Sequence, residues 1–156
     1  MNEQRVSVLF LCTGNSARSQ MAEAILRALS HDRIEVASAG TEPQVEIHPM
    51  ARQAVRTLLN LDMTGQHPKR LDRFLDRDFD YVITVCDRAA ETCPVFPGDP
   101  ERIHWSYEDP AAAVGTEDER QRAFDSTARQ MLARMRTWLS LPALQRRIET
   151  ASQAGR

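Results

Sequence analysis

Apolar residues along this chain fall into short runs rich in β-branched side chains, separated by longer stretches with helical spacing. The short runs, which predict buried strands, are Val6–Leu11, Ile34–Ser38, Tyr81–Val85 and Ile103–Trp105. The stretches with helical spacing are Ala17–Leu29, Pro49–Leu61 and Gln121–Leu141, and a short helix or turn is predicted over Leu71–Leu75. Strands that alternate with helices are typical of a parallel sheet. The pattern therefore predicts an α/β fold with a four-stranded parallel sheet flanked by helices on both faces.

The chain has the size and composition of one soluble domain. Its 156 residues are 42% apolar and 27% charged, and a chain of this length can bury a sizeable core without disulfides or metals. No internal repeat or linker divides it. Residues 1–143 are expected to form the domain, while the polar residues 144–156 predict a frayed C-terminal tail.

Charge, hydropathy and cysteine content exclude several classes of protein. Lys and Arg number 20 against 22 Asp and Glu, and the resulting charge of −2 does not suit a nucleic-acid-binding surface. The longest apolar run, Val8–Cys12, is too short to span a membrane. The polar start of the chain and its odd number of cysteines argue against a secreted disulfide scaffold, so a cytoplasmic protein is expected.

A candidate oxyanion site lies between the first predicted strand and the first predicted helix. The loop reads Cys12-Thr13-Gly14-Asn15-Ser16-Ala17-Arg18-Ser19. Ligands of open α/β sheets bind at this kind of position, where backbone N–H groups at a helix start form an anion-binding concavity. Gly14 is expected to adopt an unusual backbone conformation and to permit close approach of the backbone to a ligand.

The side chains of this loop suit nucleophilic chemistry on a tetrahedral oxyanion. Arg18 can hold the oxyanion with two parallel hydrogen bonds, and the positive surroundings are expected to lower the pKa of Cys12 so that it reacts as a thiolate. Ser19 is placed to donate a hydrogen bond to that thiolate. The alternative is a buried Cys12 at a strand end and a solvated Arg18, which the strand, glycine and helix around them disfavour.

Two further cysteines bracket one short segment after the third predicted strand. A simple phosphatase needs a single cysteine, so the additional pair, Cys86 and Cys93, suggests a thiol relay. Asp87 is a good helix N-cap, and a short helix is expected over the residues that follow it. A zinc site is disfavoured because the chain has no C-x2-C pair and no fourth ligand at a suitable spacing. Two inert buried cysteines are the remaining alternative.

These motifs also resemble those of a known family. Val8–Ala24 resembles the signature of the low-molecular-weight protein tyrosine phosphatase superfamily, and more narrowly that of the thioredoxin-coupled arsenate reductases built on the same fold. Further matches in order and spacing are Ser38-Ala39-Gly40-Thr41, His104-Trp105 and Asp109-Pro110. The resemblance extends from about Ser7 to Leu141. It implies a single low-molecular-weight phosphatase-like domain.

The resemblance implies a role for each candidate residue. Cys12 would attack arsenate while Thr13–Ser19 bind the oxyanion, and Asp109 would protonate the leaving oxygen. Cys86 would then attack the sulfur of Cys12 and release arsenite, and Cys93 would form a disulfide with Cys86 that thioredoxin reduces. A second resolving cysteine favours thioredoxin over glutaredoxin with glutathione. Phosphate is expected to bind as an analogue of arsenate.

The resemblance also raises the question of a bound cation. Some arsenate reductases of this type bind potassium beside the loop, and the matching residues here are Asn15, Glu23 and Ser38. A further acidic ligand of the family falls at Lys69 or Arg70. A cationic side chain there would replace the potassium, so no bound metal or other cofactor is expected.

Two other functions remain open on the sequence. Tyrosine phosphatases of this fold carry aromatic residues just after the Asp-Pro pair, where this chain has Ala111, Ala112 and Ala113, which weakens that alternative. Because arsenate and phosphate are near-isosteric, weak phosphatase activity is expected even of an arsenate reductase. A non-enzymatic oxyanion-binding module is the second alternative, and it would lose no function from Cys12→Ser beyond altered affinity.

Overall fold

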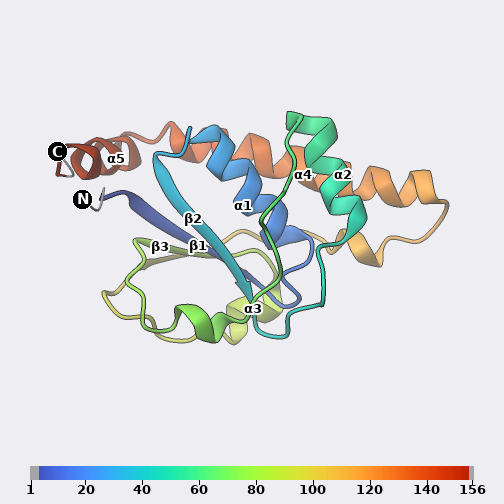
Figure 1. Ribbon diagram of the computed structural model, residues 1–156, viewed down its shortest axis with the longest axis horizontal. Helices are drawn as coiled ribbons and strands as arrows, with labels where there is room; N and C mark the ends of the chain where they lie inside the picture. Colours follow the sequence, from blue (N-terminus) through green and yellow to red (C-terminus); the bar gives the residue numbers. More distant parts are fainter. Residues whose placement is uncertain (1–3, 155–156) are drawn as a thin grey trace.

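The computed structural model describes residues 4–154 and has the predicted parallel sheet at its centre (Figure 1). The sheet has four strands in the order β2-β1-β3-β4. Their bounds are β1 Val6–Cys12, β2 Ile34–Gly40, β3 Tyr81–Thr84 and β4 Glu101–His104. Because β1 pairs with both β2 and β3, all seven of its residues are buried, as its continuous apolar run predicts.

The register of the strands brings the chemistry-bearing residues to one edge of the sheet. Cys12 at the end of β1 lies opposite Gly40 on β2, and Leu11 lies opposite Thr84 on β3. The N–H group of Val85 donates to the carbonyl of Leu11 at 2.9 Å, which continues the pairing beyond β3. The loop after Cys12 and the segment that starts at Cys86 are therefore neighbours.

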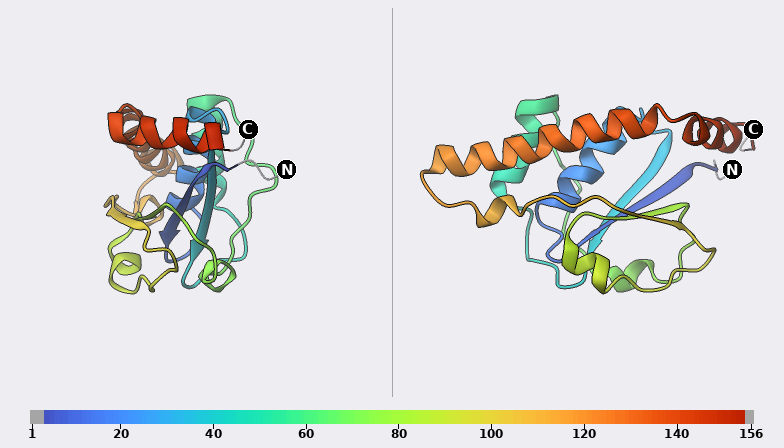
Figure 2. Two further views of the ribbon diagram at one scale, coloured as in Figure 1. Left: turned by 90° about the vertical axis from the view of Figure 1, so that its left-hand side faces the viewer. Right: turned by 180° about the vertical axis from the view of Figure 1, so that it is seen from behind.

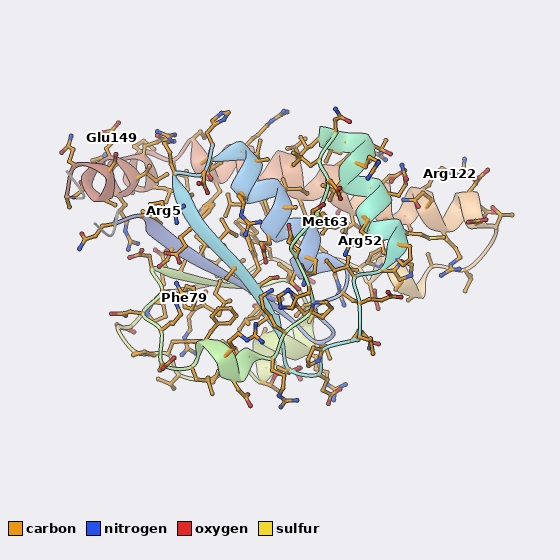
Figure 3. The ribbon with its side chains drawn as sticks, viewed as in Figure 1. Arg5, Arg52, Met63, Phe79, Arg122 and Glu149 are labelled. Carbon is orange, nitrogen blue, oxygen red and sulfur yellow. The ribbon has the colours of Figure 1, made fainter. Side chains whose placement is uncertain are left out.

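Helices cover the sheet on both sides (Figure 2). Three of them pack on one another over one side, and these are α1 Arg18–Leu29, α2 Pro49–Leu59 and α4 Glu117–Leu139. The short elements η1 Leu71–Phe74 and α3 Asp87–Glu91 lie on the other side, and η2 Pro110–Ala112 precedes α4. Around η1, Phe79 packs edge-on between Phe74 and Phe96, with ring centroids 5.8 and 6.2 Å apart, and Phe79 is labelled in Figure 3.

Amphipathic patterns explain the two main helices. In α1, Met21 and Ile25 are fully buried, one turn apart. In α4 the same holds for Met131 and Met135. This helix begins at Glu117 rather than at the predicted Gln121, because the side chain and backbone of Thr116 form a capping box with Glu119.

Residues 144–154 belong to a helix, which corrects the prediction of a frayed polar tail over residues 144–156; the last two of these lie outside the described residues. Helix α5 spans Pro142–Ala154, and Leu144 and Ile148 on its inner face are each only 2% exposed. Arg147 forms an ion pair with Asp80 at 2.8 Å and stacks over the ring of Tyr81. Two buried residues one turn apart are enough to hold this short helix against β1 and α4. They are too few to stand out as a helical pattern in the sequence.

Within residues 4–154, none of the helices has both the length and the apolar character that crossing a bilayer requires.

Candidate active site

The loop between β1 and α1 has the compact form expected of an oxyanion site, but Asn15 provides its unusual backbone conformation. Asn15 adopts a left-handed φ of 47°, whereas Gly14 is not among the residues with a positive φ. Asparagine tolerates this conformation better than most residues. Gly40 on the neighbouring strand is the glycine that permits close approach, because a Cβ atom there would lie 2.5 Å from the carbonyl oxygen of Thr13.

The start of α1 is open to an anion. Its N-cap residue is Ala17, which has no side chain that could cap the first-turn N–H groups. Uncapped N–H groups at a helix start carry a partial positive charge and bind anions. The predicted oxyanion-binding residues Thr13–Ser19 are therefore brought together around one helix start.

Cys12 is buried, 3% exposed, and its sulfur lies among hydrogen-bond donors. The N–H group of Asn15 donates to Sγ at 3.2 Å, and the hydroxyl of Ser19 lies 2.8 Å from Sγ. Asn15 Nδ2 donates to the oxygen of that hydroxyl at 2.7 Å. The Ser19 proton is therefore free to point at the sulfur, as the sequence predicts.

The prediction that this loop lowers the pKa of Cys12 is not supported by the structure. Burial raises the pKa of the Cys12 thiol above its ordinary value, and the hydrogen bonds from Ser19 and Asn15 lower it by less than burial raises it. The neighbouring Cys86 raises the Cys12 pKa further. Desolvation penalises a charged thiolate whatever its partners, so the donors reduce this penalty without removing it.

Arg18 and Asp109, which are far apart in the sequence, meet in the structure. Arg18 Nη1 donates to the carbonyl of Tyr107 at 3.0 Å, and its Nη2 lies 4.0 Å from Asp109 Oδ2. Asp109 Oδ1 in turn accepts from the N–H group of Ala111 at the start of η2. Both predicted residues therefore line one pocket with Cys12, of about 610 Å³. The contribution of Tyr107 is a backbone carbonyl, which no side-chain motif could have indicated.

A second wall of this pocket was missed in the sequence. Residues 41–48 run alongside the Cys12 loop and make backbone hydrogen bonds to its carbonyls of 2.9 to 3.3 Å. Glu42, Gln44 and His48 from this stretch line the pocket. Burial lowers the pKa of His48, so its ring is held neutral more strongly than usual. The turn signal Gly40-Thr41 after a buried strand was the available indication that the chain returns past the loop.

Behind the loop lies a buried polar network that ends on a carboxylate. Asn15 Nδ2 donates to Ser38 Oγ at 3.0 Å, and Ser38 Oγ donates to Glu23 Oε1 at 2.7 Å. Glu23 is 4% exposed, and Arg27 pairs with its other oxygen at 2.6 Å. Lys69 Nζ lies 3.8 Å from Glu23 Oε1, and the N–H group of Lys69 donates to Asn15 Oδ1. Two side-chain cations thus already face Glu23.

This donor set does not fit a bound potassium ion. The residues that match the cation ligands of the family are present, but an ammonium and a guanidinium group stand beside their only carboxylate. A metal cation there would be repelled by both. Elsewhere in residues 4–154, no group of three or more His, Cys, Asp or Glu side chains is arranged to hold a metal ion.

Cys86 lies beside the Cys12 loop, and Cys93 lies beyond the short helix α3. Cys86 is buried, and its sulfur is 3.5 Å from Thr13 Oγ1 in the oxyanion loop. Cys93 follows α3 and is half-buried, and burial raises the pKa of its thiol. All three cysteines are free thiols. The predicted short helix is present as α3, but its N-cap is Cys86 rather than Asp87.

Comparisons with known proteins show the family of this chain. Residues 7–148 match the family described as low molecular weight phosphotyrosine protein phosphatase. The chain is 37% identical over 131 residues to an arsenate reductase of Halalkalibacterium halodurans, which covers 84% of this chain and 93% of that protein.

Two solved structures extend the comparison to the fold. An arsenate reductase in its oxidized state aligns with 94% of this chain and 98% of its own, with a TM-score of 0.71 and 26% identity. A thioredoxin-dependent arsenate reductase of Corynebacterium glutamicum aligns with 88% of this chain, with a TM-score of 0.60 and 27% identity. The aligned part covers 65% of that longer protein. On the family match and these relatives together, the chain belongs to the low molecular weight phosphotyrosine protein phosphatase family, as a relative of its arsenate reductases.

Proposed function

We propose that this protein reduces arsenate to arsenite, with Cys12 as nucleophile and Cys86 and Cys93 as a thiol relay that thioredoxin recycles. The observation that carries the proposal is the placement of three free thiols in series. Cys12 lies in an oxyanion loop, Cys86 contacts Thr13 of that same loop, and Cys93 follows Cys86 across one short helix. The relatives named arsenate reductase support this assignment.

The first step is attack of the Cys12 thiolate on As(V) of bound arsenate. The S–As bond forms as one oxygen leaves, and Asp109 supplies the proton that lets this oxygen depart as water. Arg18 and the loop N–H groups hold the remaining oxygens. The Ser19 hydroxyl and the Asn15 N–H group stabilise the thiolate before attack, against the cost of its burial.

The next two steps move two electrons onto arsenic. The Cys86 thiolate attacks Sγ of Cys12, an S–S bond forms, and the electron pair of the S–As bond stays on arsenic, which leaves as arsenite with As(III). Cys93 then attacks Sγ of Cys86, and Cys12 leaves as a thiolate. Thioredoxin supplies the two electrons and two protons that reduce the Cys86–Cys93 disulfide.

The last exchange requires α3 to unwind. A helix rises by about 1.5 Å per residue, so the steps from Cys86, the N-cap of α3, to its C-cap Thr92 span about 9 Å, whereas a disulfide needs its two Cα atoms within about 7 Å. Helix α3 spans only Asp87–Glu91, and Ala89 is its one buried residue. A helix this short depends on its packing, so unwinding it costs little. The rearranged segment presents the disulfide to thioredoxin.

A phosphatase is the second candidate, and it shares the first half of this chemistry. Phosphate is close in size and charge to arsenate, and attack by Cys12 with protonation by Asp109 needs no relay. Ala111, which lines the pocket after Asp109, offers no aromatic surface for a phenyl ring. We therefore propose that phosphatase activity is present but weak.

The test separates these two functions. Cys12→Ser is expected to abolish both arsenate reduction and hydrolysis of an aryl phosphate. Cys86→Ser and Cys93→Ser are each expected to keep the aryl phosphatase activity and to lose multiple-turnover arsenate reduction with thioredoxin. A relay variant that reduces arsenate over many turnovers would disprove the relay, and equal rates with glutaredoxin and glutathione would disprove the choice of thioredoxin.

We also propose that Lys69 takes the role that potassium has in some relatives. The contacts that support this are the two distances from Lys69 to the network, 3.8 Å from its ammonium nitrogen to Glu23 and 3.0 Å from its N–H group to Asn15. Burial lowers the pKa of Lys69, and Glu23 opposes that effect. A fixed cation at this position balances the buried carboxylate and keeps Asn15 oriented towards Ser19.

A further inference from the structure

The edge strand β4 and the loop after it contact both ends of the segment that carries the relay cysteines. This segment, residues 86–94, is called here the redox segment. At its start, Asp87 Oδ1 lies 2.9 Å from His104 Nε2 and accepts from Ser106 Oγ at 3.2 Å. At its end, the carbonyl of Pro94 accepts from Arg102 Nη2 at 2.9 Å. Residues 102 and 104 alternate on one strand, so their side chains share one face of the sheet.

His104 is itself held in place by a neighbouring strand. Its Nδ1 lies 2.8 Å from the hydroxyl of Thr84 on β3. In a neutral ring, Nδ1 accepts the Thr84 proton and Nε2 donates to Asp87, so both ring nitrogens are satisfied in this arrangement. The hydrogen bond from His104 is the largest of the effects that lower the pKa of Asp87, which keeps Asp87 in its accepting, ionised form.

The helical form of the redox segment has few other supports. Within α3 only Ala89 is buried, and the ion pair of Arg88 with Glu42 is exposed and 3.4 Å long. An exposed pair of this kind contributes little. The His104 contact links α3 to two strands of the sheet, through Thr84 on β3 and through its own place on β4. It is therefore the contact that best fixes where the helix begins, one residue after Cys86.

We propose that His104 is a positioning residue of the relay, whose hydrogen bond to Asp87 stabilises the helical dithiol form of the redox segment and so sets the reduction potential of the Cys86–Cys93 pair. This inference rests on the proposed relay. The disulfide requires the helix to unwind, and unwinding breaks the contact between His104 and Asp87. The contact therefore favours the two thiols over the disulfide, and it keeps the reduced segment ready for the next arsenate.

The contact between His104 and Asp87 is present in the dithiol form and broken in the disulfide form, and this difference sets the expected effect of removing it. Asp87 is largely exposed, so the contact is screened by water, and we expect His104→Ala to shift the dithiol–disulfide equilibrium towards the disulfide by about three- to tenfold. For a two-electron couple this is a reduction potential more negative by about 15 to 30 mV. The direction is specific, because a loss of general stability does not favour one redox form over the other.

The experiment is a redox titration of the full-length chain in a Cys12→Ser background, so that only Cys86 and Cys93 exchange. Mixtures of reduced and oxidised dithiothreitol set the potential, and the disulfide fraction is measured by alkylation and mass spectrometry. His104→Gln, whose amide nitrogen can still donate to Asp87, is expected to restore most of the potential. His67→Ala removes an exposed loop histidine and is the matched control, with no expected shift.

A double-mutant cycle with Asp87→Ala, which removes the accepting oxygen, tests whether the effect acts through this pair. The shifts in potential of the two single variants are expected not to add up in the double variant, because either substitution alone already removes the contact.

An unchanged potential in His104→Ala, with the disulfide still forming, overturns the positioning role and leaves the proposed function intact. If no Cys86–Cys93 disulfide forms in any variant, both the relay and this inference are wrong. Should His104→Ala fail to fold, Ser106→Ala removes the other donor to the same oxygen and is expected to shift the potential in the same direction.

Discussion

Replacing Ser19 by alanine tests how the buried Cys12 becomes a nucleophile. The hydroxyl of Ser19 lies 2.8 Å from Cys12 Sγ, and Asn15 Nδ2 occupies its oxygen, so its proton faces the sulfur. Burial already raises the pKa of Cys12, and the hydrogen bond from Ser19 is the strongest effect that lowers it. The variant removes this donor and leaves the N–H group of Asn15 in place.

The size of the effect follows from the strength of a hydrogen bond to a charged group. Such a bond contributes about 1.5–3 kcal/mol, so its loss lowers the thiolate population at neutral pH by about 10- to 100-fold. We expect the rate of hydrolysis of an aryl phosphate, and of arsenate reduction, to fall by about the same factor. Because the pKa of Cys12 rises, the rate should recover as the pH is raised, and the pH profile should shift in the alkaline direction.

The assay measures this thiol alone. In a background with Cys86→Ser and Cys93→Ser, the rate of alkylation by iodoacetamide against pH reports the Cys12 thiolate, and the aryl phosphatase profile is recorded in parallel. Ser30→Ala is the matched control, because Ser30 is equally buried and its hydroxyl bonds only to a helix carbonyl. An alkylation profile in Ser19→Ala identical to that of the parent would refute the assignment of the hydroxyl as a donor to the thiolate.

Three further predictions concern the cation, the C-terminal helix and the redox segment. Lys69→Met should lower aryl phosphatase activity in sodium buffer and make it respond to added potassium, and a variant indifferent to potassium would contradict the proposed replacement. Ile148→Ala should lower the free energy of unfolding by about 2–5 kcal/mol in a urea titration, whereas the exposed Arg146→Ala should leave it nearly unchanged. Amide hydrogen exchange over residues 87–95 should be faster in the disulfide form than in the dithiol form, with residues 6–11 protected in both; equal protection would exclude the unwinding of α3.

The parts of the site that could be predicted are those fixed by strand ends. The apolar run of β1 predicts a central strand, and its last residue predicts where Cys12 lies relative to the sheet. Asp109 could be assigned through the resemblance to a known family, and the structure brings it to within 4.0 Å of Arg18. At these positions the apolar pattern and the motifs of the chain agree with the topology of the sheet, so the sequence alone was enough to predict where the residues lie.

The parts that could not be predicted depend on burial and on backbone contacts. The spacing of Cys12 and Arg18 predicts a positively charged site that would lower the pKa of Cys12. The burial of the thiol, which the spacing does not reveal, raises that pKa instead. Arg18 donates to the backbone carbonyl of Tyr107 at 3.0 Å. A backbone carbonyl is present at every residue, so no sequence motif could have indicated this contact. In α5, the burial of Ile148 depends on packing of the helix against β1 and α4 rather than on its own helical pattern.

One feature of the topology connects the two chemistries of this family. Cys12 is the last residue of β1, and Cys86 lies two residues after the end of β3. These two strands are paired neighbours, so the second thiol lies beside the oxyanion loop without any special segment to bring it there. Phosphoryl transfer uses only the first strand end. The proposed relay requires in addition a cysteine just after the neighbouring strand and a short helix after it that can open. The proposed relay therefore adds to the phosphatase-like site without a change in the sheet, and the contacts of β4 with residues 87 and 94 hold the segment that must move in the last exchange.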